Sequence, residues 1–426
     1  MSKGVNGFGR ILSSLRLPGA AFALALLLAG CARPPLPGTD EVPAGLPTHS
    51  GIYADVGPRW SHDGRHIAFL RVRPDRTLQL FLADAGLSRP LALLEPDLVE
   101  PDRGYSPGRE RYTSPDTLAW SPHDRQIAFE RAEEFTFDNG DHLFGTGLWS
   151  LDLPSGRVFP LALHPKDYFE PFYYYRAPHW SPDGRYLAFL GEGIHGERCL
   201  LIHPLAGQKP QEVTAHFDNY EESDWPAWEP PAVGGPESLV YRQTIRRTPA
   251  VPSTETLRRI CPGSADGTAT GEILRVTAQD YARQLPAQET SQTVVPRVGH
   301  LAWSPNGRWL AFTLTPDGNN FGRYELWIVN NAGQGARRVS PRDRRGYFAP
   351  VWLDSGHLGA LSPQGGRFDV VSVDIAARTA RVLGVLPTAD CDWSPDRTRI
   401  VYALPFADSP PDSRTATTLR ILALTP

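Results

Sequence analysis

One pattern of apolar and polar positions recurs along most of this 426-residue chain. In its fullest copy, Trp180 precedes the polar stretch 181–186, which is followed by the apolar run Leu187-Ala188-Phe189. Side chains alternate between the two faces of a strand, so Leu187 and Phe189 share one face and Ala188 points to the other. The run therefore predicts a strand that is buried on both faces, with a close neighbour on the alanine side.

The polar stretch between these apolar positions predicts a tight turn. Pro182 suits a backbone φ of about −65°, Asp183 can cap the turn with its carboxylate, and Gly184 can adopt a positive φ. No helical periodicity is found in the repeated segments. Each copy of the pattern therefore predicts a strand, a turn and a second strand.

The pattern has five clear copies and two degenerate ones. The clear copies begin at Trp60, Trp120, Trp180, Trp303 and Trp393, and the degenerate copies begin at Trp228 and Trp352. Neighbouring copies are roughly 40–75 residues apart, which is typical of four-stranded propeller blades with variable insertions. We therefore predict an all-β fold, a single seven-bladed β-propeller over residues 51–426, with six blades as the alternative.

The last copy predicts how the ring closes. Its third strand, expected over 418–424, lies two residues before the end of the chain, so no segment follows that could form a fourth strand. The segment 51–56 precedes the first tryptophan. We expect 51–56 to be the outer strand of the last blade, because a closed ring exposes no long strand edge.

The sequence from Trp180 to Phe189 resembles the WD40-like β-propeller repeat of TolB-type proteins. Related repeats occur in sugar-lyase propellers and in the propellers of prolyl-oligopeptidase-type peptidases. The resemblance implies a non-catalytic propeller of the cell envelope that acts as an interaction scaffold, as the TolB propeller does. The alternative it implies is an enzyme of the lyase or hydrolase type, with an active site in the central channel.

Residues 1–30 resemble a bacterial lipoprotein signal peptide. Basic residues precede the apolar run 20–28, and a Leu-Ala-Gly-Cys sequence follows at 28–31. The resemblance implies cleavage before Cys31 and acylation of that cysteine, with palmitate among the acyl groups. A transmembrane anchor is the alternative, but the apolar run is shorter than the roughly 20 residues that a spanning helix needs.

Residues 31–50 would connect the lipid to the propeller. The segment is rich in proline and lacks apolar periodicity, which indicates an extended tether. Two or three acyl chains would hold the protein on a membrane. Residue 32 is alanine and not aspartate, which by the sorting rule of lipoproteins favours the periplasmic face of the outer membrane.

The charge of the chain argues against nucleic acid as a partner. Residues 1–30 hold three basic residues and no acidic ones, so their removal leaves 40 Lys and Arg against 47 Asp and Glu, a formal charge of −7. Nucleic-acid-binding domains instead present basic surfaces. No zinc-binding, phosphate-binding or Cys-x-x-Cys motif is present. We therefore expect no cofactor, and a protein partner in the envelope, with a glycan as the alternative.

Nearly all long insertions are expected on one face of the ring, opposite the short repeat turns. Three of these loops, in blades two to four, are rich in aromatic and acidic residues. Loops on a rigid scaffold often carry binding surfaces, and tyrosine and tryptophan often anchor interfaces. The alternative is that the aromatic residues only pack beneath the loops. The candidate binding residues are Phe135, Phe137, Tyr168, Phe172, Tyr173, Tyr174, Tyr175, Tyr220 and Trp225.

The same loops hold weaker candidates for chemistry. Clustered carboxylates can bind hard cations, although we expect no metal here; the weak candidates are Asp138, Asp141, Asp218 and Glu221. A propeller enzyme would need basic groups that converge on the channel, and the candidates for that role are His142, Arg176 and His179.

Three cysteines remain once Cys31 is acylated, so at least one has no partner. We expect Cys199 and Cys261 on the third strands of adjacent blades, and Cys391 elsewhere. A Cys199–Cys261 disulfide is one alternative, and buried free thiols are the other.

Overall fold

The computed structural model describes most of the chain after residue 53. The described residues are 54–72, 77–88, 90–94, 98–99, 118–136, 142–162, 174–192, 198–205, 211–212, 221–231, 237–245, 254–262, 271–277, 297–315, 323–343, 345–405 and 417–424. The chain divides between Thr48 and His49, and all the described residues belong to the second part, His49–Pro426. Within the described ranges, no helix is long and apolar enough to cross a membrane. The domain boundaries at residues 30 and 50 stay predictions, and Cys31 lies outside the described residues.

The described elements are β-strands, and they form consecutive antiparallel strand groups, each opened by a strand that ends at or beside a repeat tryptophan. The first group is β1 (Ala54–Trp60), β2 (His66–Val72), β3 (Thr77–Asp84), β4 (Leu91–Ala92) and β5 (Leu98–Val99). The second is β6 (Leu118–Trp120), β7 (Gln126–Thr136), β8 (His142–Asp152) and β9 (Arg157–Ala162). The third is β10 (Tyr174–Trp180), β11 (Tyr186–Glu192), β12 (Arg198–Pro204) and β13 (Gln211–Glu212).

The later strand groups repeat this order. The fourth is β14 (Glu221–Trp228), β15 (Leu239–Ile245), β16 (Thr254–Ile260) and β17 (Gly271–Val276). The fifth is β18 (Arg297–Trp303), β19 (Trp309–Thr315), β20 (Glu325–Asn330) and β21 (Arg337–Arg338). The sixth is β22 (Phe348–Trp352), β23 (His357–Gln364), β24 (Arg367–Asp374) and β25 (Thr379–Leu386). The seventh is β26 (Cys391–Trp393), β27 (Arg399–Pro405) and β28 (Thr417–Ala423).

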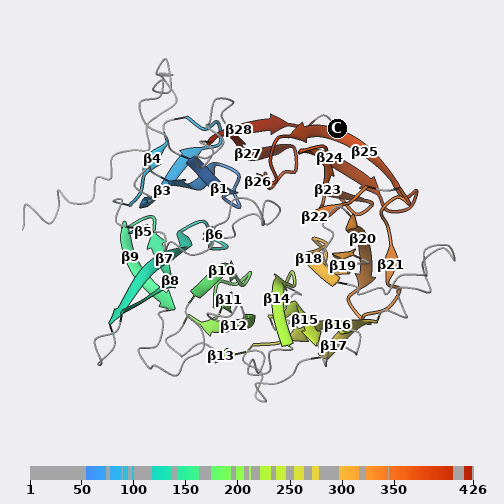
Figure 1. Cartoon of the computed structure of the whole chain (residues 1–426), viewed down its shortest axis with the longest axis horizontal. Helices are drawn as coiled ribbons and strands as arrows, with labels where there is room; N and C mark the ends of the chain where they lie inside the picture. Colours follow the sequence, from blue (N-terminus) through green and yellow to red (C-terminus); the bar gives the residue numbers. More distant parts are fainter. Residues whose placement is uncertain are drawn as a thin grey trace, which may run out of the picture. The chain divides into compact units, whose positions relative to one another are not determined.

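The sheets stand around a common centre, and most of the tryptophan-ended strands lie nearest to it (Figure 1). β1 contacts both β6 and β26, and β18 contacts both β14 and β22. Hydrogen bonds join the described strands into five sheets, of which two contain strands from two groups each. The all-β fold with blade-like sheets is therefore confirmed, whereas the number of blades stays a prediction.

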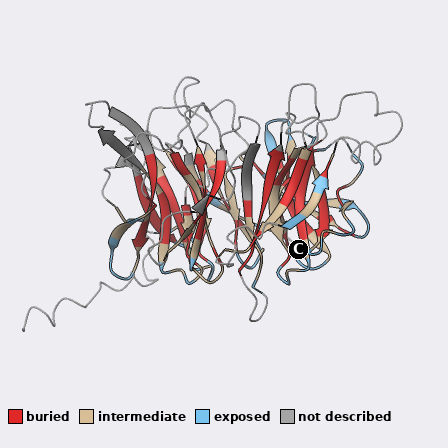
Figure 2. Ribbon diagram, turned by 90° about the horizontal axis from the view of Figure 1, so that it is seen from below, coloured by how far each residue is buried: buried red, intermediate tan, exposed pale blue. Residues whose placement is uncertain are grey.

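The core lies between neighbouring strand groups, as the alternation of large residues and alanine predicts. Ala68 packs with Trp120 and Phe129 of the second group, whereas Ile67 on the opposite face packs with Val401 of the seventh. Both faces of these strands are buried, which Figure 2 shows as red segments along them. Each fully buried large side chain contributes about 1.5–3 kcal/mol to the free energy of unfolding.

The repeat turn is closed by hydrogen bonds from its serine and aspartate. Ser181 Oγ donates to Asp183 Oδ1 at 2.7 Å, and the backbone N–H groups of Arg185 and Tyr186 donate to Asp183 Oδ1 and Ser181 Oγ. Gly184 has a φ of 72°. The turns after Trp60, Trp303 and Trp393 contain the same serine-to-carboxylate or serine-to-amide bond, so the predicted turn cap is confirmed.

The N-terminal strand does not take the predicted outer position. Ala54 to Val56 pair antiparallel with β2, which makes β1 the tryptophan-ended strand of the first group. β1 reaches β28 only through the parallel pair Ala54 and Thr417. The first and last described strands are thus joined, but the prediction that 51–56 is the outer strand of the last blade is wrong for 54–56. A comparable single parallel pair joins β10 to β8, so the contact belongs to the junction between groups.

Candidate binding site

A cavity of about 570 Å³ lies at the tryptophan ends of β1, β6, β10 and β14. This end of the strands carries the short repeat turns, so the cavity is on the face opposite the one that the sequence favours for binding. Its walls hold the four repeat tryptophans of these strands and several prolines of the turns. A volume of this size is typical of pockets for compact ligands.

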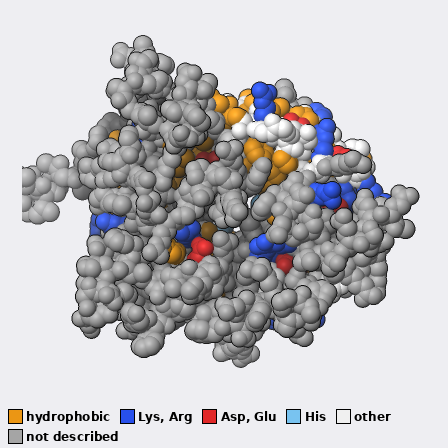
Figure 3. All heavy atoms as spheres, in the orientation of Figure 1, with side chains coloured by type: hydrophobic (Ala, Val, Ile, Leu, Met, Phe, Trp, Pro, Cys, Tyr) orange, Lys and Arg blue, Asp and Glu red, His pale blue; other side chains and the backbone are white. Residues whose placement is uncertain are grey.

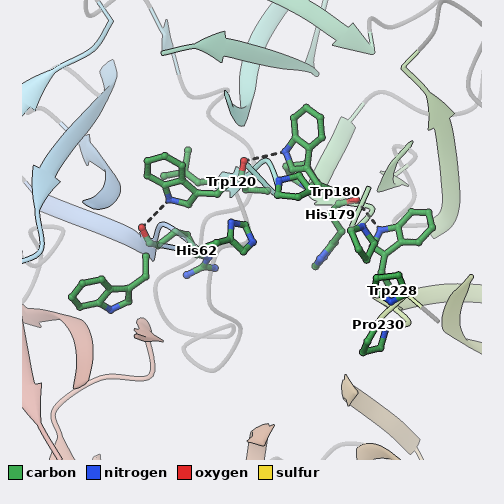
Figure 4. Close-up of a pocket in the computed structure, with 14 residues that line it drawn as sticks. His62, Trp120, His179, Trp180, Trp228 and Pro230 are labelled. Carbon is green, nitrogen blue, oxygen red and sulfur yellow. Dashed lines mark hydrogen bonds between the residues drawn. The ribbon is translucent and has the colours of Figure 1, made fainter. Parts of the chain in front are cut away.

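Three of the four tryptophans of the wall are fixed by hydrogen bonds to the preceding strand group, whereas the indole N–H of Trp60 has no acceptor among the described residues. In each of the three, the indole Nε1–H donates to the carbonyl of the residue just before the preceding repeat tryptophan, and dashed lines mark these bonds in Figure 4. The donor–acceptor pairs are Trp120 with Arg59 (3.1 Å), Trp180 with Ala119 (3.2 Å) and Trp228 with His179 (3.0 Å). A fourth bond, from Trp352 to Ala302 at 3.0 Å, follows the same rule outside the cavity. The cavity wall is therefore part of the framework that joins the groups.

Consecutive turns around the ring also touch one another, usually through a proline and a glycine. A Cβ added to Gly184 would lie 3.7 Å from the ring of Pro122 in the preceding turn. A Cβ added to Gly64 would lie 3.7 Å from the ring of Pro395. A Cβ at this distance would make an ordinary van der Waals contact, so it is the positive φ at Gly184 and Gly64, 72° and 68°, that favours glycine.

Between the first and second groups, this contact is replaced by His62 and Asp124. His62 stands where the other clear copies have proline, and Asp124 stands where most have glycine. His62 Nδ1 lies 2.8 Å from Asp124 Oδ1, and Asp124 also accepts the backbone N–H groups of His62 and Asp63, each at 2.8 Å. Asp124 has a φ of 54°, a conformation that costs free energy in a non-glycine residue. Two departures from the repeat therefore meet beside the cavity.

The polar residues that line the cavity, among those the structure describes, are Arg59, His62 and His179, and the carboxylates near them, Asp124 and Asp392, lie behind the lining. Behind the lining, Asp392 Oδ2 accepts the backbone N–H of Trp60 at 2.8 Å. Burial raises the pKa of the Asp392 carboxyl, and the charge of Arg59 acts against that rise. Figure 3 shows the opposite face of the ring, where described basic and acidic side chains also lie close together near the centre.

Acidic side chains also hold the tryptophan-ended strand of the next group. Asp390 Oδ2 accepts the backbone N–H of Gly57 at 3.0 Å, and Glu130 Oε1 accepts that of Ala177 at 3.1 Å. Gly57 and Ala177 both have positive φ values, 60° and 51°, where their strands bulge. These carboxylates therefore stabilise the bulges that shape the inner wall.

A buried ion pair makes the same kind of link between the fourth and fifth groups. The Arg242 side chain is 0% exposed and lies 3.9 Å from Glu255 Oε2. Arg242 Nη1 donates to the carbonyl of Val298, while Glu255 Oε2 accepts the N–H of Val298 at 3.1 Å. The pair therefore contributes to the junction between these two groups.

Two of the nine predicted binding residues have described side chains, and both are buried. Tyr174 is 8% exposed and Tyr175 is 3% exposed. Tyr175 packs edge-on against Phe189, with ring centroids 5.1 Å apart, inside a core between groups. Tyr174 and Tyr175 thus support the strand β10 and do not present a surface to a partner.

The other candidate loop residues cannot be placed at the cavity. Phe135 and Trp225 lie on β7 and β14, but their side chains are outside the described residues. Phe137, Tyr168, Phe172, Tyr173 and Tyr220 are themselves outside the described residues. The loop surface therefore stays a prediction.

The predicted metal-binding candidates also lie outside what the structure describes. Asp138, Asp141 and Asp218 lie outside the described residues, and Glu221 begins β14 with an undescribed side chain. In the described part of the chain, no group of three or more His, Cys, Asp or Glu side chains could hold a metal ion. The three described cysteines, Cys199, Cys261 and Cys391, are free thiols, so the Cys199–Cys261 disulfide is not formed.

The candidates for a channel enzyme are separated. His179 lines the cavity, whereas Arg176 pairs with Glu192 at 3.6 Å and lies over the ring of Tyr174. The side chain of His142 is outside the described residues. Sequence reasoning missed His62 and Asp124, although the signal was present: both break the repeat at turns whose other copies agree.

Neither a protein-family model nor a curated protein matches this sequence. Solved structures do match. The β-propeller domain of the Trilobed protease from Pyrococcus furiosus, which has an open velcro topology, matches with a TM-score of 0.53 and 13% identity over 88% of this chain and 98% of that one. The fold is a β-propeller.

Two enzymes match with similar TM-scores. An oligogalacturonate lyase from Vibrio parahaemolyticus has a TM-score of 0.53 and 11% identity, over 88% of this chain and 91% of the lyase. A puromycin-hydrolyzing peptidase from Mycobacterium tuberculosis has a TM-score of 0.56 and 15% identity, over 87% of this chain and 51% of the peptidase. This propeller thus spans about half the length of the peptidase. TolB structures match with TM-scores of 0.39 and 0.41, too low to carry an argument.

Proposed function

We propose that this propeller is a lipid-anchored scaffold of the bacterial cell envelope that binds a protein partner. The observation that carries the proposal is the cavity on the turn face, whose walls are fixed before any ligand arrives. The indole N–H groups of Trp120, Trp180 and Trp228 are already bonded to carbonyls, so what they offer a ligand is apolar ring surface. Preformed apolar walls with a few polar groups are typical of binding sites.

The envelope location rests on the N-terminal sequence. The basic and apolar residues before Cys31 resemble a lipoprotein signal, and the proline-rich segment after it suits a tether. Acylation at Cys31 would place the propeller on the periplasmic face of the outer membrane. The aromatic loops on the opposite face, including Tyr168 and Tyr173, are a second candidate surface for a protein or a glycan.

An enzyme remains the second candidate, and one observation favours it. The imidazole of His62 lines the cavity and is held by the carboxylate of Asp124, which is how general bases are oriented in many active sites. This alternative would be favoured if the purified protein, without a partner, converted a substrate and the substitution of His62 abolished that conversion.

The proposal is tested by recovery of a partner from intact cells after chemical crosslinking. Pro231 is exposed at the cavity, and Val382 on β25, which does not line the cavity, is 47% exposed. Arginine can therefore replace either residue without being buried. We expect Pro231→Arg to abolish a specific crosslinked partner and Val382→Arg to retain it. Equal recovery with both variants would overturn the role of the cavity.

A further inference from the structure

The contact between His62 and Asp124 is a built polar feature at a site whose walls are mostly tryptophan and proline. Four other clear copies of the repeat have proline at the position of His62: Pro122, Pro182, Pro305 and Pro395. The repeat therefore builds its turn without a histidine, and the fold alone does not explain His62. Because Asp124 accepts three hydrogen bonds, it fixes both the backbone and the ring of the preceding turn.

The position of Asp124 determines what His62 can offer to a ligand. Nδ1 lies against Asp124 Oδ1, so Nε2 is on the side of the ring away from that carboxylate. Asp124 itself is only 15% exposed, whereas the His62 side chain is 58% exposed. A neutral ring that donates Nδ1–H to Asp124 has an accepting Nε2, whereas a protonated ring donates from both nitrogens, one to Asp124 and one outward. In its protonated form, His62 therefore acts as a donor toward an anion.

The other polar residues of the lining are also basic. Arg59 and His179 line the cavity with His62, and no Asp or Glu is among the described lining residues. A ligand complementary to this wall carries a negative charge on an apolar body. Charge complementarity of this kind gives a site its specificity, whereas the apolar walls supply contact area.

The shape of the cavity favours an extended ligand. Its walls come from four consecutive strand ends, and the labelled residues from His62 to Trp228 and Pro230 follow an arc in Figure 4. A ligand that contacts this whole arc is longer than a single amino acid. Grooves lined with aromatic rings are a common way to bind extended peptides, and terminal carboxylates are a recurrent recognition feature.

We propose that the cavity binds the C-terminal end of a polypeptide, with its last, apolar side chain between the tryptophan and proline walls and its carboxylate on His62 and Arg59. The proposal rests on the proposed function and specifies which part of the partner is bound. Asp124 is the positioning residue for His62.

The test is isothermal titration of the purified propeller with two forms of one probe peptide, acetyl-Gly-Pro-Pro-Phe, as the free acid and as the C-terminal amide. A hydrogen bond to a charged group predicts that the acid binds about tenfold more tightly than the amide. Acetyl-phenylalanine is the third probe. It should bind more weakly than the peptide acid, because it cannot span the arc.

The decisive variant is the double substitution His62→Pro and Asp124→Gly, which restores the proline–glycine contact of the other turns. We expect it to keep the thermal stability of the native protein and to lose the preference for the acid. The matched control is His123→Asp, which restores the repeat residue in the same turn without touching the cavity lining. If the double variant unfolds, His62→Gln serves instead, since it keeps the backbone bond to Asp124.

Three results would overturn the inference: no binding of the peptide acid, equal affinity for acid and amide, or an unchanged preference in the double variant. Acetyl-phenylalanine that binds as tightly as the peptide would assign the cavity to small organic acids instead. Each of these can occur while a partner is still crosslinked at the cavity in cells. Failure of the inference is thereby distinguished from failure of the proposed function.

Discussion

The carboxylate of Asp390 accepts a hydrogen bond from the backbone N–H of Gly57 at 3.0 Å, although 333 residues separate the two in the sequence. Two residues further on, Asp392 accepts the N–H of Trp60 at 2.8 Å. These bonds fasten β26 and the residue before it to β1, whereas the strand ladder joins β1 only to β28, through the pair Ala54 and Thr417. The ends of the propeller are thus held largely by side chains.

Loss of the Asp390 carboxylate should weaken this junction. Asp390→Ala leaves a partly buried N–H group without its acceptor, so we expect the free energy of unfolding to fall by about 1–3 kcal/mol. Urea unfolding measures that change, and hydrogen exchange should show faster exchange in β1 and β26. Glu272→Ala is the control, since Glu272 pairs with Arg275 on the surface and such pairs contribute about 0–1 kcal/mol. Equal losses in both variants would contradict the assigned role.

The indole bonds between strand groups should be measurable by comparing two tryptophans. Trp180 donates to Ala119, whereas the indole N–H of Trp303 at the equivalent position finds no acceptor among the described residues. Phenylalanine removes the donor at either site with a similar loss of ring volume. We expect Trp180→Phe to lower the free energy of unfolding by about 1–2 kcal/mol more than Trp303→Phe. A smaller effect at Trp180 would show that the indole bond adds nothing to stability.

The repeat turns should lose stability in acid. The hydroxyl of Ser394 and the backbone N–H of Thr398 donate to Asp396 and hold its pKa below the usual value. A carboxyl whose pKa is lower in the folded state contributes stability that is complete above about pH 4 and is lost as the pH falls through the folded pKa. Asp396→Asn should therefore lower the melting temperature at neutral pH.

In strong acid, the difference between this variant and the native protein should shrink, because the native carboxyl is then protonated. Asn306 occupies the equivalent place in another turn, where it accepts from Ser304 at 2.8 Å, so asparagine is compatible with the fold. Thermal melts across the acidic range measure the difference. A gap that stays constant with pH would exclude the carboxylate as its cause.

The turns and the strands buried on both faces were predictable, because several copies of the pattern indicate them independently. The turn cap at Asp183 and the close approach at Ala68 follow from residue type and alternation alone. The pairing of β1 follows the same pattern, because a strand that ends at the tryptophan pairs with the strand after the turn in the other copies as well. The bonds from Gly57 and Trp60 to Asp390 and Asp392 were not predictable, because these residues are distant in the sequence.

The site was harder to predict than the fold. Tyr174 and Tyr175 belong to an aromatic run, yet β10 begins within that run and takes both into the core. The cavity depends on how four strand ends meet, which no single segment encodes. His62 and Asp124 could have been found by asking where the repeat departs from itself and whether two departures fall on neighbouring turns.

The lipid anchor makes a separate prediction. Growth with labelled palmitate should label the protein expressed from its full sequence, because the sequence around Cys31 resembles an acylation site. Cys31→Ala should abolish the label and release the protein from the membrane fraction, whereas Cys391→Ala should change neither. Labelling that persists without Cys31 would remove the anchor from the account.

The central claim is that the turn-face cavity is where this propeller meets its partner. Incorporation of a photo-crosslinking amino acid at position 231, beside the cavity, and at position 382, on the outer strand β25, tests it in living cells. The account predicts one discrete crosslinked protein from position 231 and none from position 382. Crosslinks from 382 alone, or none from 231, would contradict it.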